Sequence, residues 1–174
     1  QPTMPATDAA TGRAAYFSKY DIVRDDYRAV MASCALPGFC RPVKVGDRYY
    51  YDGGVADSIP LHHAIEHGCT KMVVILSNPR DFVKKPEAHR PLYKHMLHKY
   101  PKTIQSIDNR HINYQASIDL ACRLEKEGYV FIFAPSRHMP LSTFSKDAAL
   151  EQDLYDLGVA DYEARAEELK HFLN

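Results

Sequence analysis

Short apolar runs alternate with stretches of helical periodicity along the chain, and this alternation predicts an α/β fold. Residues 71–77 (KMVVILS) and 129–134 (YVFIFA) are rich in β-branched or aromatic side chains, which is typical of strands buried on both faces. Residues 49–51 are all tyrosine and predict a further short strand. Residues 13–18 (RAAYFS) predict an edge or hairpin strand that follows a turn at Thr11-Gly12.

The helix predicted before residue 36 has one apolar face. Its apolar residues recur at spacings of three and four, as Tyr27, Val30, Met31 and Cys34. Either Asp21 or Asp25 can cap its first turn, because an Asp side chain accepts hydrogen bonds from the unpaired N–H groups there. Pro37-Gly38 ends the helix.

Further helices are predicted downstream. One lies between Asp57 and Gly68, and a helix followed by the strand at 71–77 forms half of a βαβ unit. The longest covers residues 102–127. A C-terminal helical segment spans 135–174, where Gly158 is expected to separate two helices. Together these elements predict a three-layer α/β sandwich with a mostly parallel sheet.

Residues 78–101 are the least regular stretch, with four prolines and many basic residues among apolar ones. A solvated helix packed on one side is the interpretation we favour. The alternative is a mobile basic and apolar lid that contacts lipid headgroups, since such segments can lie on anionic surfaces.

Composition narrows the class of protein. The 174 residues are 45% apolar and 25% charged, as in ordinary globular domains. Lys+Arg and Asp+Glu are balanced at 22 each, so nothing indicates a nucleic-acid partner. No P-loop or G-x-G-x-x-G is present, so nucleotide binding has no support. No cofactor is expected.

The cysteines and histidines give no strong indication of a disulfide or metal site. The four cysteines (Cys34, Cys40, Cys69 and Cys122) include no C-x-x-C pair, so reduced thiols are favoured over a disulfide framework or a zinc site. His63 and His67 share a predicted helix face, and His95 and His98 are three residues apart, but neither pair has a local third ligand. We therefore expect no metal site.

The candidate chemistry lies at Asp52-Gly53-Gly54, directly after the tyrosine strand. Two glycines permit positive φ and close approach of backbone or ligand, because neither has a Cβ. An Asp at a strand end followed by such a turn can hold its carboxylate at the rim of a sheet, where open α/β sheets place their chemistry. Taken alone, however, the tripeptide is typical of a simple tight turn.

The flanking residues change that interpretation. Four segments appear in a fixed order within about sixty residues, which chance produces far less readily than one short motif. They are 6–12 (ATDAATG), 32–39 (ASCALPGF), 52–55 (DGGV) and 59–61 (IPL). In this order they resemble the patatin-like phospholipase family, in its bacterial type.

The resemblance implies an α/β acyl hydrolase with a Ser–Asp dyad. In that family the Ser stands on a G-x-S-x-G elbow, a Gly-rich segment supplies the oxyanion hole, and the Asp of D-G-G is the partner of the Ser. The role of Asp52 as catalytic base, with Gly53 and Gly54 as its supporting turn, is carried over from this pattern. None of the eight glycines begins a G-x-S-x-G, so no nucleophile is assigned in this chain.

We accordingly expect residues 1–174, which begin with Gln1, to be the C-terminal portion of a patatin-like domain, with the nucleophile upstream and this chain inactive alone. Ser33 is the serine nearest the motif, but it lacks an elbow and a structural role is favoured. His62 or His63 could support Asp52, although the resemblance does not require it.

The function expected is hydrolysis of a lipid acyl ester. The alternative is a non-catalytic patatin-like scaffold that binds lipid or protein, and a third option is a complete chain with another chemistry. The expected partners are a lipid or ester substrate, a transiently contacted membrane surface and a second copy paired through an exposed sheet edge. The expected location is cytoplasmic, including a peripheral membrane position. The sequence has no run of 18 apolar residues, so no membrane span is predicted.

Overall fold

The computed structural model describes residues 2–140 and 146–174. Residues 141–145, which belong to the predicted helical segment 135–174, lie outside the described part. Contacts divide the chain into two compact units. Unit 1 comprises Gln1–Pro60 and Lys84–Ile118, and unit 2 comprises Leu61–Val83 and Asp119–Asn174.

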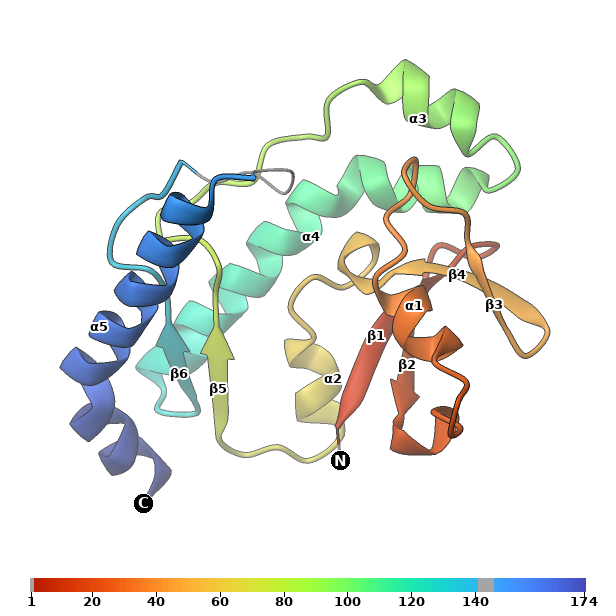
Figure 1. Cartoon of the computed structure of the whole chain (residues 1–174). Helices are drawn as coiled ribbons and strands as arrows, with labels where there is room; N and C mark the ends of the chain where they lie inside the picture. The colour runs from red at the N-terminus through yellow and green to blue at the C-terminus, as the bar shows by residue number, and fades with distance from the viewer. Residues whose placement is uncertain (1, 141–145) are drawn as a thin grey trace. The chain divides into compact units, whose positions relative to one another are not determined.

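Unit 1 contains a four-stranded sheet in the order β2-β1-β4-β3 (Figure 1). Its strands are β1 (Thr3–Asp8), β2 (Ala14–Ser18), β3 (Val43–Val45) and β4 (Arg48–Asp52). Strand β1 pairs with β2 on one side and with β4 on the other, where Ala6 lies opposite Asp52. The predicted strands at 13–18 and 49–51 are confirmed.

All three strand pairs of this sheet are antiparallel, which differs from the mostly parallel sheet expected. For the β1–β2 and β3–β4 pairs the reason is the short connection, since antiparallel neighbours can be joined by tight turns and parallel ones need a long crossover. Strands β1 and β4 also pair antiparallel, although residues 9–47 separate them in the chain. Gly12 (φ +68°) turns the chain between β1 and β2, and Gly46 (φ +59°) turns it between β3 and β4. The mixed α/β character is as predicted.

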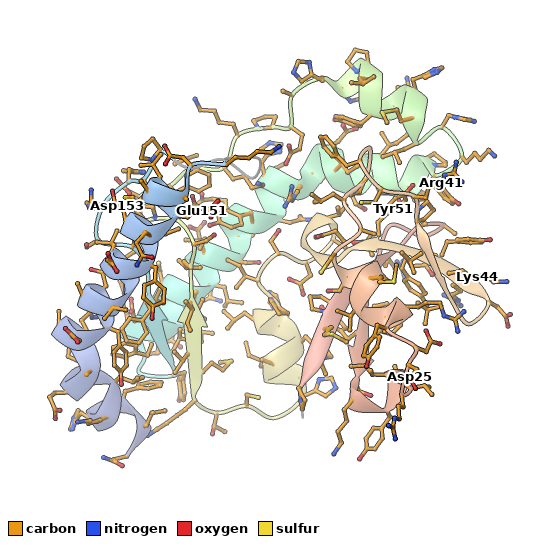
Figure 2. The ribbon with its side chains drawn as sticks, viewed as in Figure 1. Asp25, Arg41, Lys44, Tyr51, Glu151 and Asp153 are labelled. Carbon is orange, nitrogen blue, oxygen red and sulfur yellow. The ribbon has the colours of Figure 1, made fainter. Side chains whose placement is uncertain are left out.

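Unit 1 has an apolar core on each face of the sheet, because successive strand residues point to opposite faces. Tyr51 (Figure 2) packs with Val55 and with Ile104 and Ile107 of helix α4 (Pro101–Lys126). Tyr50 packs on the other face, in a cluster that contains Ala6, Phe17, Ala29 and Ala32. The last two belong to α1 (Arg28–Ser33).

Helix α1 is shorter than predicted and buries a different face. Ala29 and Ala32 are buried, whereas Tyr27 and Met31 are 58% and 59% exposed. The cap is also different, because Asp25 has φ +66° and the N-cap position is Tyr27. Small alanine side chains allow the helix to approach the sheet closely, so periodicity of large residues indicated the wrong face.

The predicted one-sided helix in 78–101 is present as α3 (Arg90–Met96). Tyr93 packs against the α4 side of the core and Leu97, just after the helix, is 2% exposed. Leu92 and Met96 are 60% and 49% exposed. The segment therefore has one packed and one solvated side.

Unit 2 contains α2 (Leu61–Glu66), β5 (Met72–Ile75), β6 (Val130–Phe133) and α5 (Ala148–Leu173). Strands β5 and β6 are parallel, with Met72 opposite Val130, and a long helical connection joins them. Strand β6 is buried as predicted, but in β5 Val73 is 40% and Ile75 79% exposed. The expectation that β5 is buried on both faces is therefore wrong for this unit.

Helix α5 runs without interruption through Gly158, where a break was predicted. One glycine in a helix interior costs only about 1 kcal/mol relative to alanine. The Asp147 side chain offsets part of this, because it accepts hydrogen bonds from the N–H groups of Ala149 and Leu150. In the described part of the chain no helix is both long and apolar enough to cross a membrane.

Candidate functional site

Asp52 is the last residue of β4, and its backbone is held on both sides. Its N–H donates to the Ala35 carbonyl at 2.9 Å. Its own carbonyl accepts from Thr7 Oγ1 at 2.7 Å. Thr7 is fully buried in β1, so the strand end is anchored to the centre of the sheet.

The half-buried Asp52 side chain is held through one oxygen. Oδ1 accepts the N–H of Gly54 at 2.7 Å, which caps the short 3₁₀ helix η2 (Gly53–Val55). Among the residues that the structure describes, none donates a hydrogen bond to the second oxygen, Oδ2. The carboxylate is thus oriented by Oδ1 and has Oδ2 left as a proton acceptor.

Space requires a glycine at position 53 and leaves little room for a side chain at position 54, whereas φ requires a glycine at neither position. The positive φ expected from the sequence is therefore not used. Neither residue has a positive φ. A Cβ on buried Gly53 would lie 2.3 Å from the Pro5 carbonyl oxygen, and a Cβ on Gly54 would lie 3.0 Å from Asp52 Oδ1. The turn therefore brings backbone against backbone, and it brings Gly54 against the carboxylate.

The predicted segment 6–12 supports this turn from β1. Thr7 Oγ1 accepts the N–H of Ala56 at 3.2 Å, in addition to donating to Asp52. The next residue, Asp8, accepts the N–H groups of Ala10 and Thr11 and pairs with Arg48 Nη1 at 3.0 Å. Burial raises the pKa of Asp8, but these donors outweigh it and hold the pKa below its ordinary value.

Sequence reasoning missed Arg110, which reaches the turn from α4. Its Nε donates to the Gly54 carbonyl at 2.7 Å, and its Nη1 pairs with Glu87 at 2.9 Å. Arg110 is 56 residues from Gly54, and no local spacing links the two. The one signal available was a polar residue within the apolar periodicity of the long helix α4.

The structure gives Ser33 a structural contact and does not gather the candidate cysteines and histidines into one site. Ser33 Oγ donates to the Pro5 carbonyl at 2.7 Å, which fits the structural role favoured from the sequence. The four cysteines are free thiols, three of them exposed. Within the described ranges no cluster of three or more His, Cys, Asp or Glu is arranged to hold a metal ion. His62 and His63 belong to unit 2, and Asp52 belongs to unit 1.

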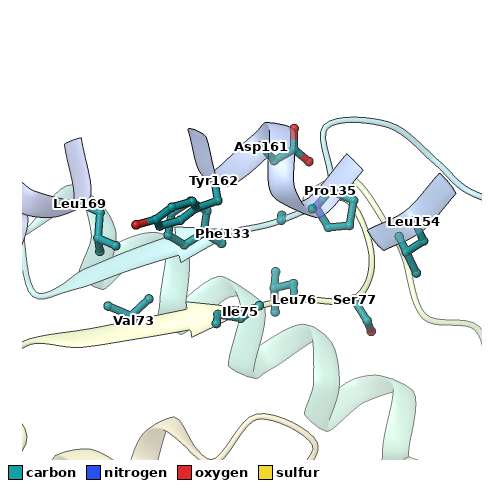
Figure 3. Close-up of a pocket in the computed structure, with 12 residues that line it drawn as sticks. Val73, Ile75, Leu76, Ser77, Phe133, Pro135, Leu154, Asp161, Tyr162 and Leu169 are labelled. Carbon is teal, nitrogen blue, oxygen red and sulfur yellow. The ribbon is translucent and has the colours of Figure 1, made fainter. Parts of the chain in front are cut away.

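Unit 2 has a cavity of about 410 Å³. Its walls come from β5, β6 and α5 and include Ile75, Phe133, Leu154 and Tyr162 (Figure 3). Asp161 is a charged residue in the lining, and its Oδ2 already accepts the N–H of Ser136. The cavity thus offers apolar surface and no set of converging reactive groups.

Comparison with known proteins gives two family matches. The model of the Patatin-like phospholipase family matches residues 6–65, which include the end of β1, all of β4 and Asp52. A domain of unknown function, DUF6363, matches residues 100–174. No curated protein matches the chain. The first match supports the resemblance to patatin-like phospholipases over that segment.

Proposed function

We propose that this chain supplies the catalytic base of a lipid acyl ester hydrolase, with Asp52 as that base. The observation that carries the proposal is the state of its carboxylate. Oδ1 is held at 2.7 Å by the Gly54 N–H, and no described residue donates to Oδ2. The residue stands in the segment similar to Patatin-like phospholipase, a family of acyl hydrolases.

In the proposed mechanism a serine from another part of the full-length protein is the nucleophile. A serine hydroxyl is a weak nucleophile and needs a base within hydrogen-bond reach. Asp52 Oδ2 takes the hydroxyl proton as the serine oxygen attacks the ester carbonyl. The proton then passes to the departing alcohol oxygen, and an acyl-enzyme remains.

Water completes the reaction. Asp52 Oδ2 takes a proton from the attacking water, the acyl–serine ester bond breaks, and the proton returns to the serine oxygen. The fatty acid leaves and the carboxylate is regenerated. Backbone N–H donors outside this chain stabilise the oxyanion in both steps. No histidine is needed, because the Asp52 carboxylate takes the proton directly from the serine or the water.

This function implies a larger fold and domain. We propose that residues 1–174 form the C-terminal portion of a three-layer α/β domain whose remaining strands include the nucleophile-bearing one. The 135–174 segment is its helical end. The proposed substrate is a lipid or a simple ester. We propose that the protein is in solution and contacts the membrane surface transiently to reach it. An exposed edge of β5 is the proposed site of pairing with a second copy.

The test is Asp52→Asn in the full-length protein. Asn keeps an oxygen that can accept the Gly54 N–H, so the turn is retained while the base is lost. We expect hydrolysis of a p-nitrophenyl acyl ester and of phospholipid vesicles to be abolished. Asp47→Asn, an exposed carboxylate on the same hairpin, is the matched control and should retain activity.

Labelling with a fluorophosphonate, measured by intact mass, completes the test. One adduct on the full-length protein and none on residues 1–174 supports a serine outside this chain. Retained activity in a folded Asp52→Asn variant would remove Asp52 from the mechanism. If the full-length protein takes up no label and hydrolyses no ester, a scaffold that binds lipid or protein replaces this proposal.

A further inference from the structure

Gly54 connects the Asp52 carboxylate to the rest of unit 1, and it does so without a side chain. Its N–H fixes Asp52 Oδ1 at 2.7 Å. Its carbonyl accepts two donors, Arg110 Nε and Ser58 Oγ, each at 2.7 Å. Since glycine has no side-chain packing to fix it, these backbone contacts fix the position of Gly54 and, through its N–H, the orientation of the Asp52 carboxylate.

The two donors differ in origin. Ser58 is four residues from Gly54 and belongs to the same turn. Arg110 comes from α4, which is also packed against the sheet through Ile104 and Ile107. The bond from Arg110 therefore fixes the turn to a separate and rigid element, which the bond from Ser58 does not.

The guanidinium is itself held in one orientation. Its Nη1 pairs with Glu87 Oε1 at 2.9 Å, and Lys84 Nζ lies 3.7 Å from the same oxygen. The side chains of Lys84, Arg110 and Glu87 are 20%, 27% and 35% exposed, so bulk water screens the group only partly. Lys84 also lies over the ring of Tyr114 at 5.8 Å. Burial, and after it the charge of Arg110, lowers the pKa of Lys84.

We infer that Arg110 is a positioning residue for Asp52, acting through the Gly54 carbonyl, and that Glu87 holds Arg110 in place. This inference rests on the proposed function. A planar guanidinium can donate to Gly54 and Glu87 at once through two different nitrogens, whereas a lysine ammonium is a point charge on a flexible stem. A positive charge at position 110 is therefore not enough to make both contacts.

The experiment is steady-state kinetics of the full-length Arg110→Lys variant with a p-nitrophenyl ester. We expect kcat to fall by ~10²-fold with KM little changed, because a misplacement of about 1 Å at a reacting group has that effect. Arg90→Lys is the matched control. Arg90 also pairs with α4, through Asp108, but does not touch the turn, so kcat should be unchanged.

A second measurement separates positioning from general stability. Amide hydrogen exchange at Gly54, followed by NMR, should lose protection in Arg110→Lys while the thermal midpoint stays near that of the wild type. Unchanged kcat with unchanged Gly54 protection overturns the inference. A raised KM with unchanged kcat also overturns it, because that result indicates substrate binding.

Two further outcomes remain interpretable. If Arg110→Lys does not fold, Glu87→Gln is measured in its place. A fall in kcat smaller than that expected for Arg110→Lys supports the inference, and an unchanged kcat overturns it. Failure of the proposed function is distinct, since the wild type would then be inactive or Asp52→Asn active. In that case the Gly54 exchange still decides whether Arg110 fixes the turn.

Discussion

Gly53 and Pro5 are in backbone contact so close that a single Cβ would not fit between them. A Cβ at Gly53 would lie 2.3 Å from the Pro5 carbonyl oxygen and 2.5 Å from the carbonyl carbon. The contact extends the β1–β4 pairing, in which Ala6 lies opposite Asp52, by one residue at each strand. Asp52 therefore directly precedes a residue whose backbone cannot shift toward β1 without displacing that strand.

Gly53→Ala is expected to destabilise the protein. Overpacking a tight site typically costs about 1–3 kcal/mol of the free energy of unfolding, and here the obstacle is backbone. Urea denaturation of the full-length protein measures the loss. The matched control is Gly158→Ala in α5, where a Cβ meets nothing within 4 Å and stability should rise by roughly 0.5–1 kcal/mol. Equal stability of Gly53→Ala and wild type would contradict the close contact.

The sequence predicted the strand end at Asp52 correctly because the signals for it are local. Three consecutive tyrosines predict β4, and an acid with two glycines predicts its abrupt end, so Asp52 is placed at a strand terminus from a handful of adjacent residues. The long helix α4 follows equally from periodicity. Such features depend on residues close together in the chain.

The features that sequence reasoning missed depend on distant residues. Nothing near Arg110 indicates that it reaches Gly54, and nothing near Ala29 and Ala32 indicates that alanines form the buried face of α1. The antiparallel pairing of β1 with β4 also depends on distant residues, because β4 begins only at Arg48 whereas the other partner, β2, begins at Ala14. Tertiary packing decides each of these.

Stability should decline in acid through Asp8. In the folded protein the pKa of Asp8 is below its ordinary value. The ionised carboxylate therefore stabilises the folded state, and this contribution is fully present at a pH above the unfolded pKa of about 3.9. That stability is lost as the pH falls from there through the lower folded pKa. Asp8→Asn should show a flatter decline of the unfolding free energy between pH 5 and 3. Identical slopes for the two proteins would argue against the role of Asp8.

Stability should also decline in strong alkali through Tyr51. Burial, with a smaller effect of Tyr100, raises the pKa of Tyr51 to about 12. The unfolded chain ionises this phenol near 10, so the stability is complete below pH 10 and is lost as the pH rises toward 12. Tyr51→Phe should remove that part of the decline in denaturation experiments at pH 10–12. A variant that declines as steeply as wild type would assign the effect elsewhere.

Ser33→Ala should retain hydrolysis in the full-length protein. Ser33 Oγ donates to the Pro5 carbonyl at 2.7 Å, so its removal leaves an acceptor without that donor. The expected cost is about 1 kcal/mol of unfolding free energy, with kcat and fluorophosphonate labelling unchanged. Loss of labelling in a folded Ser33→Ala variant would instead identify Ser33 as the nucleophile.

The hydrogen bonds from α4 to the β1–β2 corner set the order in which this unit can be completed during synthesis. Thr103 Oγ1 and Ser106 Oγ donate to the carbonyls of Ala9 and Gly12, each across 94 positions of the chain. At about 5–20 residues per second a ribosome needs roughly 5–20 s to make that length. Once Val55 has been made, the face carrying Tyr51 and Val55 lacks its α4 cover for the rest of this interval, so the nascent chain exposes apolar surface of the kind that chaperones protect until α4 emerges.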